Sequence, residues 1–394
     1  MKDFILVITP DRHNYITPIC DYLKYELVFR DIVLDVDLEK EIPLAVIFLG
    51  DWLYEHEVFI KKCKHYNIPT ILMMDGTIEW KHFFENPKWS FGGKAAPYFP
   101  VLCDKIFVPG PSTYRFLDFF GNQGKCEITG LPRFDRYNQS QTKKVLNNGT
   151  KIIGVMSGNT AGYTNEQIQQ SKKLFEDIYK WAGNQSKIDV IWRLRKGFSK
   201  TLDFPIENDI SDNLEEFLGN VDAVVCQPST AAYEAMLLGV PVAIADYSIA
   251  PNYMKAAWEI KGSEQIDLVI NSLINPEPIK VMLQQHLLED TLSSIGNSSA
   301  VAAQLINDII QLKLESPNKE LPADLYIKYI DGKTNTSSFT ESLFPNQTAY
   351  HFNDLALLKE AYAKLESHLN KLEKQLHRRT PGFWMERLIS KILK

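Results

Sequence analysis

The stretch from 227 to 241 carries the residues best suited to chemistry, and it reads Gln-Pro-Ser-Thr-Ala-Ala-Tyr-Glu-Ala-Met-Leu-Leu-Gly-Val-Pro. An apolar run at 221–226 precedes it and is typical of a short buried strand. Ser229 and Thr230 then occupy the position of a helix N-cap, ahead of several good helix formers. Hydroxyl groups and free amides placed there would bind an anion at the carboxyl edge of a parallel sheet, although an ordinary capped helix has the same pattern.

Three cations lie together at the end of another predicted strand, at 189–194. They are Arg193, Arg195 and Lys196. The chain has a formal net charge of −6, so this concentration of cations favours an anionic ligand such as a phosphate. Alternate side chains of a strand point to opposite faces, so we expect the two arginines to share a face without Lys196. The alternative is a set of solvated charges at the start of a loop.

Asp75 directly follows a predicted buried strand at 68–74 and precedes Gly76. A carboxylate at the edge of a sheet can accept the proton of an acceptor hydroxyl group, which makes Asp75 the candidate catalytic base. An Asp-Gly pair is also a common turn former, which is the alternative interpretation.

Two other loops have small or charged residues. Gly130 allows a close turn of the backbone, and Arg133 can either face a phosphate or pair with Asp135. Ser157 belongs to a loop of small residues that can approach a ligand closely, but the loop lacks the Gly-Lys-Ser/Thr ending of a P-loop.

Short apolar strands alternate with helical stretches along most of the chain, which predicts an α/β fold with parallel sheets covered by helices on both faces. The pattern begins again after a polar break at 147–150. We therefore expect two Rossmann-like domains, at 1–147 and 148–315. In the first domain, the aromatic-rich stretch 80–98 is predicted to be a loop over the site or a packed surface loop.

A polar linker at 316–353 and a helical tail at 354–394 are expected to follow. Leucine and tyrosine recur at intervals of three and four residues from Leu355 to Leu376, which predicts either a coiled coil or a long helix packed on the domains. After Pro381, a basic amphipathic helix at 383–394 can lie on an anionic membrane surface or begin a further module.

The composition, with 45% hydrophobic and 23% charged residues, is that of a soluble globular protein. The acidic net charge does not favour nucleic-acid binding. The five cysteines are scattered without a Cys-x-x-Cys pair, which indicates free or buried thiols in a reducing compartment. The sequence shows neither a signal peptide nor an apolar run of about 20 residues. We expect a cytoplasmic protein, either free or peripheral on the cytoplasmic membrane face.

Four stretches in succession resemble the GT-B glycosyltransferase superfamily, namely 104–110, 128–135, 193–197 and 227–241. Within it, the resemblance is to the cell-surface branch of capsule and lipopolysaccharide transferases, teichoic-acid glycerophosphotransferases and non-hydrolysing nucleotide-sugar epimerases. It covers residues 100 to 250. It implies that Ser229, Thr230 and Glu234 hold the phosphates and ribose of a donor, and that Asp75 is the base. The full expected donor site comprises Gly130, Arg133, Ser157, Arg193, Arg195, Lys196, Gln227, Ser229, Thr230 and Glu234.

The sequence departs from this group in two places. The His-Pro pair that sialyl- and glycerophosphotransferases tend to have is replaced at 194–197 by Leu-Arg-Lys-Gly. The first glutamate of the retaining EX7E pattern is missing, because residue 226 is a cysteine, which favours an inverting reaction.

The resemblance implies an enzyme that transfers a sugar from a nucleotide-sugar co-substrate to a surface glycan such as an O-antigen or a capsule, with no metal and no other cofactor. The acceptor would be a glycan or a lipid-linked glycan. The C-terminal helix would contact the inner membrane, a second copy of the chain or a further module. Three alternatives remain open: a nucleotide-sugar epimerase, a CDP-glycerol-type glycerophosphotransferase, and a non-catalytic glycan-assembly scaffold.

Overall fold

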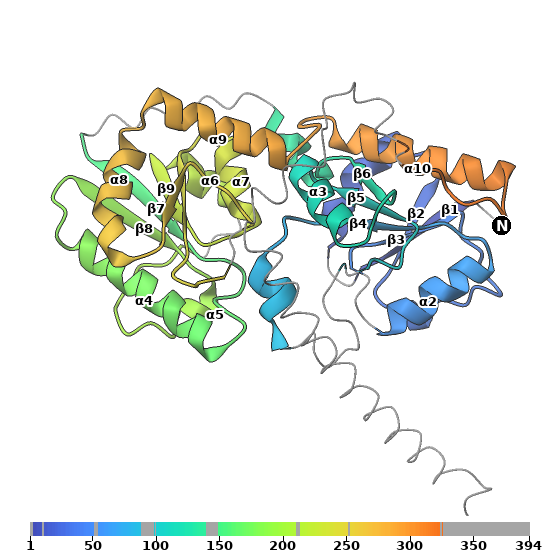
Figure 1. The fold of residues 1–394 in the computed structure, drawn as a ribbon, viewed down its shortest axis with the longest axis horizontal. Helices are drawn as coiled ribbons and strands as arrows, with labels where there is room; N and C mark the ends of the chain where they lie inside the picture. Colours follow the sequence, from blue (N-terminus) through green and yellow to red (C-terminus); the bar gives the residue numbers. More distant parts are fainter. Residues whose placement is uncertain are drawn as a thin grey trace, which may run out of the picture.

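The chain folds around two parallel sheets, each flanked by helices (Figure 1). The structure is a computed structural model that describes residues 3–325, except 10–11, 51–53, 88–97, 99, 139–148, 210–212, 251–252 and 324. The first sheet has six strands in the order β2-β1-β3-β4-β5-β6, and the second has five in the order β11-β10-β9-β7-β8. This arrangement confirms the predicted α/β class with two Rossmann-like units.

The elements around the first sheet are β1 (Phe4–Ile8), α1 (His13–Ile16), η1 (Thr17–Tyr22), β2 (Glu26–Arg30), η2 (Val33–Asp35), β3 (Ala45–Phe48), α2 (Tyr54–His65), β4 (Thr70–Met73), η3 (Lys81–Glu85), β5 (Lys105–Val108), α3 (Pro111–Phe119), β6 (Cys126–Ile128) and η5 (Pro132–Asn138). The strand β2 ends at Arg30 and is followed by η2. Among the described strands β2 pairs with β1, whose paired residues stop at Ile8 opposite Arg30.

The elements that follow are β7 (Lys151–Met156), α4 (Asn165–Ala182), β8 (Ile188–Arg193), α5 (Lys196–Ser199), α6 (Leu214–Gly219), β9 (Ala223–Cys226), α7 (Thr230–Leu237), β10 (Val242–Ala245), β11 (Trp258–Ile260), η6 (Ser263–Gln265), α8 (Ile266–Ile274), α9 (Pro278–Thr291) and α10 (Ser298–Glu315). The strand β11 was not predicted from the sequence.

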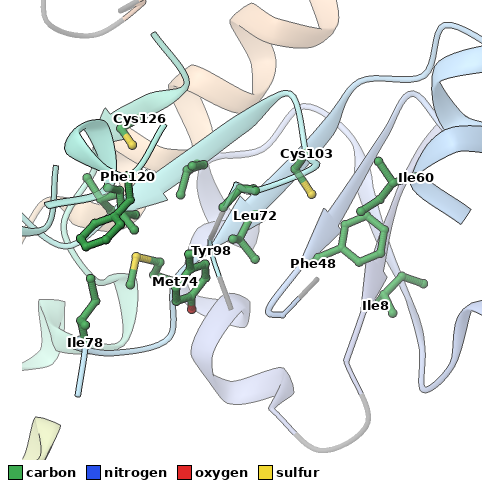
Figure 2. Packing of buried hydrophobic residues seen from close by; sticks show 14 of the residues in the cluster. Ile8, Phe48, Ile60, Leu72, Met74, Ile78, Tyr98, Cys103, Phe120 and Cys126 are labelled. Atoms are coloured by element: carbon green, nitrogen blue, oxygen red, sulfur yellow. The ribbon is translucent and has the colours of Figure 1, made fainter. Parts of the chain in front are cut away.

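The central strands are buried on both faces, as expected of parallel strands covered by helices on each side. The core on one face of the first sheet contains Phe48 and Leu72 together with Ile60 of α2 and Phe120 after α3, and Figure 2 shows Ile60 beside Phe48. All five cysteines are free thiols, and four of them are buried.

Helix α10 covers the other face of the first sheet, although the chain reaches it after completing the second sheet (Figure 1). Ile306 and Ile310 of α10 pack with Ile5 and Val7 of β1 in a single core. The range 148–315 expected for the second domain therefore ends in a helix that lies on the first.

The chain beyond α10 continues along the first domain. Lys105 and Glu127 form an ion pair at 2.6 Å, and their side chains are 1% and 0% exposed. The carbonyl oxygen of Pro322 accepts a hydrogen bond from Lys105 Nζ at 2.6 Å, and the amide of Leu325 donates to Glu127 at 2.8 Å. We call the described residues 321–323 and 325 the strap. The expected linker thus begins with a segment held on the first domain.

The predicted leucine stripe and basic helix lie outside the described residues. Within the part of the chain that is described, no helix is both long and apolar enough to cross a membrane.

Candidate active site between the two domains

The loop after β4 and the start of α7 meet where the carboxyl ends of the two sheets face each other. The amide of Thr77 donates to Thr230 Oγ1 at 3.4 Å. A Cβ atom at Gly76 would lie only 2.5 Å from the same oxygen, so a side chain at this position would require the Thr230 hydroxyl group to move. The candidate base and the candidate phosphate-binding residues therefore come from loops that touch.

Asp75 lies in this loop, directly before Gly76. Its carboxylate forms an ion pair with Arg12, which lies between β1 and α1, and the two side chains are partly exposed. The pair places one negative and one positive group at the carboxyl edge of the first sheet.

On the second domain, Ser229 is the N-cap residue of α7 by its extended backbone, as predicted, but its side chain makes no capping hydrogen bond. Its hydroxyl oxygen is instead 3.6 Å from the sulfur of Cys226. Gln227 is buried, and its side chain accepts from the amide of Gly158 at 3.3 Å and donates to Ser171 at 2.8 Å. The side-chain amide of Gln227 therefore links the loop after β7 to α4.

Glu234 is another buried member of the predicted donor residues, with a side chain only 7% exposed. It accepts a hydrogen bond of 2.5 Å from Tyr137 and contacts Arg136 at 3.2 Å and Arg133 at 3.6 Å. These three partners lie on η5, where the chain passes from the first sheet to the second. Burial lowers the pKa of Arg133 and opposes the effect of Glu234, which raises it.

The expected alternative of an Arg133–Asp135 pair is wrong. The Asp135 carboxylate accepts hydrogen bonds from the amides of Ser298 and Ser299 at 2.8 and 2.7 Å, and so caps the start of α10. Gly130 also faces this region, because a Cβ atom there would lie 2.3 Å from the carbonyl oxygen of Ser293. The backbone at Gly130 therefore packs closely against another segment of the same chain, at Ser293.

The three predicted cations separate. Arg193 pairs with Asp209 at 3.3 Å. The side chain of Arg195 donates to the carbonyl oxygen of Asn159, and its amide donates to Ser157 Oγ at 2.9 Å. Lys196 is exposed at the start of α5. Since β8 ends at Arg193, Arg195 lies beyond the strand, and the expectation that the two arginines share a strand face is not met.

Sequence reasoning missed a layer of buried and partly buried polar groups between the domains. Lys81 of η3 pairs with Asp246, which follows β10, at 3.0 Å, and their side chains are 6% and 7% exposed. Tyr163, from the loop before α4, donates to Glu79 at 3.2 Å. Gln167 donates to Glu85 at 2.7 Å.

Burial is the largest influence on Glu79 and raises its pKa to about 7, against the opposing effects of Lys81 and Tyr163. The charged residues within the aromatic stretch could have indicated these interdomain polar contacts. No pattern in the sequence, however, indicated which residues of the second domain would be their partners. Most of that stretch, which was expected to form a loop over the site, lies outside the described residues.

Neither a protein-family model nor a curated protein sequence matches the chain. Solved structures do match its fold. The MnaA–UDP structure from S. aureus has a TM-score of 0.52 at 13% identity, covering 82% of this chain and 100% of that one. The wall teichoic acid polymerase TagF with CDPG has a TM-score of 0.51 at 15% identity, covering 79% and 90%. The UDP-GlcNAc 2-epimerase from Methanocaldococcus jannaschii, with UDP-GlcNAc and UDP, has a TM-score of 0.51 at 12% identity, covering 78% and 100%.

The chain has a GT-B-type fold. At these identities the comparisons establish the architecture and not the reaction. Within this GT-B fold, Asp75 and Thr230 lie on adjoining loops of the two domains. Ser157 and Arg195 are in contact with each other at the ends of β7 and β8. Among the described residues, no group of three or more His, Cys, Asp or Glu side chains could hold a metal ion.

Proposed function

We propose that the chain is a glycosyltransferase that moves a sugar from a nucleotide-sugar donor onto a surface glycan such as an O-antigen or a capsule. The observation that carries this proposal is the contact between the N-terminus of α7 and the loop after β4. A helix N-terminus presents backbone amides and a partial positive charge, which suit the phosphates of such a donor. Ser229 adds a hydroxyl group that α7 does not use for capping.

The proposed reaction places the donor on the second domain and the acceptor on the first. The oxygen of the acceptor hydroxyl group forms a bond with the anomeric carbon, and the bond from that carbon to the phosphate breaks. The nucleotide diphosphate leaves with the electron pair. Inversion at the anomeric carbon follows from a single displacement. The α7 N-terminus and Arg195 would stabilise the leaving phosphates, so we propose that the transfer requires no metal ion.

The similar structures support a nucleotide-linked donor, because the molecules named with them are UDP, UDP-GlcNAc and CDPG. They also favour two further candidate functions, since they include both an epimerase and a teichoic acid polymerase. An epimerase would convert a nucleotide sugar into its stereoisomer without releasing the nucleotide. A glycerophosphotransferase would release CMP from CDP-glycerol. Analysis of the released nucleotide and of the sugar therefore separates these reactions.

A thermal-shift screen of the full chain with UDP, GDP, CDP, CMP and dTDP and their sugars tests donor binding, because a bound ligand raises the melting temperature by mass action. If no nucleotide shifts the melting temperature, the proposed donor site is contradicted.

The double variant Ser229→Ala, Thr230→Ala should weaken binding of the best nucleotide roughly tenfold to hundredfold, as expected for lost hydrogen bonds to a charged group. Isothermal calorimetry measures the affinity. Ser186→Ala is the matched control, because Ser186 is exposed before the amino end of β8, at the opposite edge of the sheet. Equal affinity in the double variant and the wild type would contradict the assignment.

A further inference from the structure

A small cavity between the domains connects Glu79 with the stretch that leads into α7. It has a volume of about 10 Å³, and its lining includes Glu79, Lys81, Pro228 and Asp246. That volume is about the space of a single water molecule. Pro228 directly precedes Ser229, so a carboxyl group of the first domain and the proposed phosphate site of the second border the same space.

The charged and titratable neighbours leave Glu79 without a full counter-charge. Lys81 favours the carboxylate of Glu79, but the same ammonium group is 3.0 Å from Asp246, whose negative charge disfavours it. Tyr163 donates a hydrogen bond to Glu79, and the ring of His82 lies 5.2 Å from the Tyr163 ring.

Burial has a larger effect on Glu79 than these neighbours have, and it raises the pKa of Glu79 to about 7. A carboxyl group of this kind can take up and release a proton near neutral pH. Asp75 differs, because an arginine neutralises its carboxylate directly.

We propose that Glu79 is the acid–base residue of the transfer, an inference that rests on the proposed glycosyltransferase function. As the acceptor oxygen bonds to the anomeric carbon, its proton passes to the Glu79 carboxylate. The electron pair of the broken bond leaves with the nucleotide diphosphate. The Arg12–Asp75 pair then acts as a positioning group for the acceptor. The cavity must widen for this step, so substrates enter when the two domains separate at this surface.

The test uses the full chain and the donor of the screened panel that the wild type turns over. Glu79→Gln should lower turnover roughly 10²–10⁴-fold and remove the rise in rate with pH through about 7. The affinity for the nucleotide should stay unchanged. The direction follows because a general base acts when ionised, and Glu79 ionises as the pH rises through its pKa.

Two further variants separate catalysis from structure. Glu85→Gln is the matched control, because Glu85 belongs to the same interdomain layer and bonds to Gln167 but does not line the cavity. It should keep the rise in rate with pH through about 7, the pKa of Glu79. Tyr163→Phe removes a hydrogen bond that lowers the pKa of Glu79, so the half-maximal rate should move to higher pH.

The outcomes distinguish this inference from the function on which it rests. If the wild type turns over no donor of the panel, the glycosyltransferase proposal fails and this inference fails with it. If the wild type is active and Glu79→Gln keeps both the rate and the pH profile, only the role of Glu79 is overturned. A pH profile that is lost in Asp75→Asn and kept in Glu79→Gln would return the role to Asp75.

Discussion

At the scale of single residues, the buried ion pairs connect segments that are far apart in the sequence. Glu234 of α7 is held by three side chains of η5, and Lys105 meets both Glu127 and the strap. A buried charge is costly unless it is paired and hydrogen-bonded. Each pair is therefore a place where removing one partner has a larger effect than removing both.

Lys105→Met should destabilise the protein by about 3–5 kcal/mol, because Glu127 would remain buried without its cation. The double variant Lys105→Met, Glu127→Leu should be more stable than the single variant, since it leaves no unpaired charge. Urea denaturation at equilibrium gives the free energies of unfolding, and the double-mutant cycle gives the coupling between the two residues. Additive effects of the two substitutions would contradict the pairing.

The types of residue in the site could be anticipated from the sequence, whereas their partners could not. Ser229 was placed correctly at a helix N-cap because local signals define that position. The alternative of an Arg133–Asp135 pair was wrong because both residues bind segments of the second half of the chain, Glu234 and the start of α10. Contacts between residues so far apart in the chain do not produce a recognisable pattern in the sequence.

At the scale of elements, the strands that are buried on both faces are the ones that can be located from the sequence. The strands β3, β4, β9 and β10 are continuous apolar runs, because both of their faces are covered, and the positions of β4 and β9 were predicted from such runs at 68–74 and 221–226. The strand β11 has only three residues and was missed. The packing of α10 on the first sheet was also not predicted, because the apolar pattern of a helix does not indicate which of the two sheets the helix will cover.

The connection between α9 and α10 depends on the backbone at Gly130. Gly130 has a φ of +80° and lies against Ser293 and Ser298, so Gly130→Ala adds both backbone strain and a clash. Gly121→Ala is the matched control, because Gly121 has a φ of +84° but no atom within 4 Å of a Cβ position. We expect the control to lose about 1 kcal/mol of stability and Gly130→Ala to lose clearly more. Chemical denaturation measures both, and equal losses would show that the close packing at Gly130 is unimportant.

At the scale of the whole molecule, the two domains meet through a buried layer in which three carboxyl groups accompany one cation. Glu79, Glu85 and Asp246 share Lys81, and burial raises the pKa of both glutamates. The raised pKa values mean that these groups are more easily charged when the domains separate. The closed arrangement is therefore favoured at low pH and loses stability as the pH rises through about 7, the pKa of Glu79.

Small-angle X-ray scattering should accordingly give a larger radius of gyration at pH 8 than at pH 6. Glu79→Gln should remove most of this change, because glutamine keeps the shape of the side chain and does not ionise. Glu85 continues to titrate in that variant, and Glu79→Gln, Glu85→Gln should show the least dependence. A radius that does not change with pH in the wild type would contradict this account of domain closure.

The strap has a mechanical consequence. Lys105 is the first residue of β5, so the strap is fastened at the amino ends of the strands, whereas the candidate active site lies at their carboxyl ends. Tension on the chain beyond residue 325 would be borne first by the Lys105–Glu127 pair and the first sheet. The surface between the domains would carry none of that load. A pull on the chain beyond residue 325 would then leave the two domains free to separate and close.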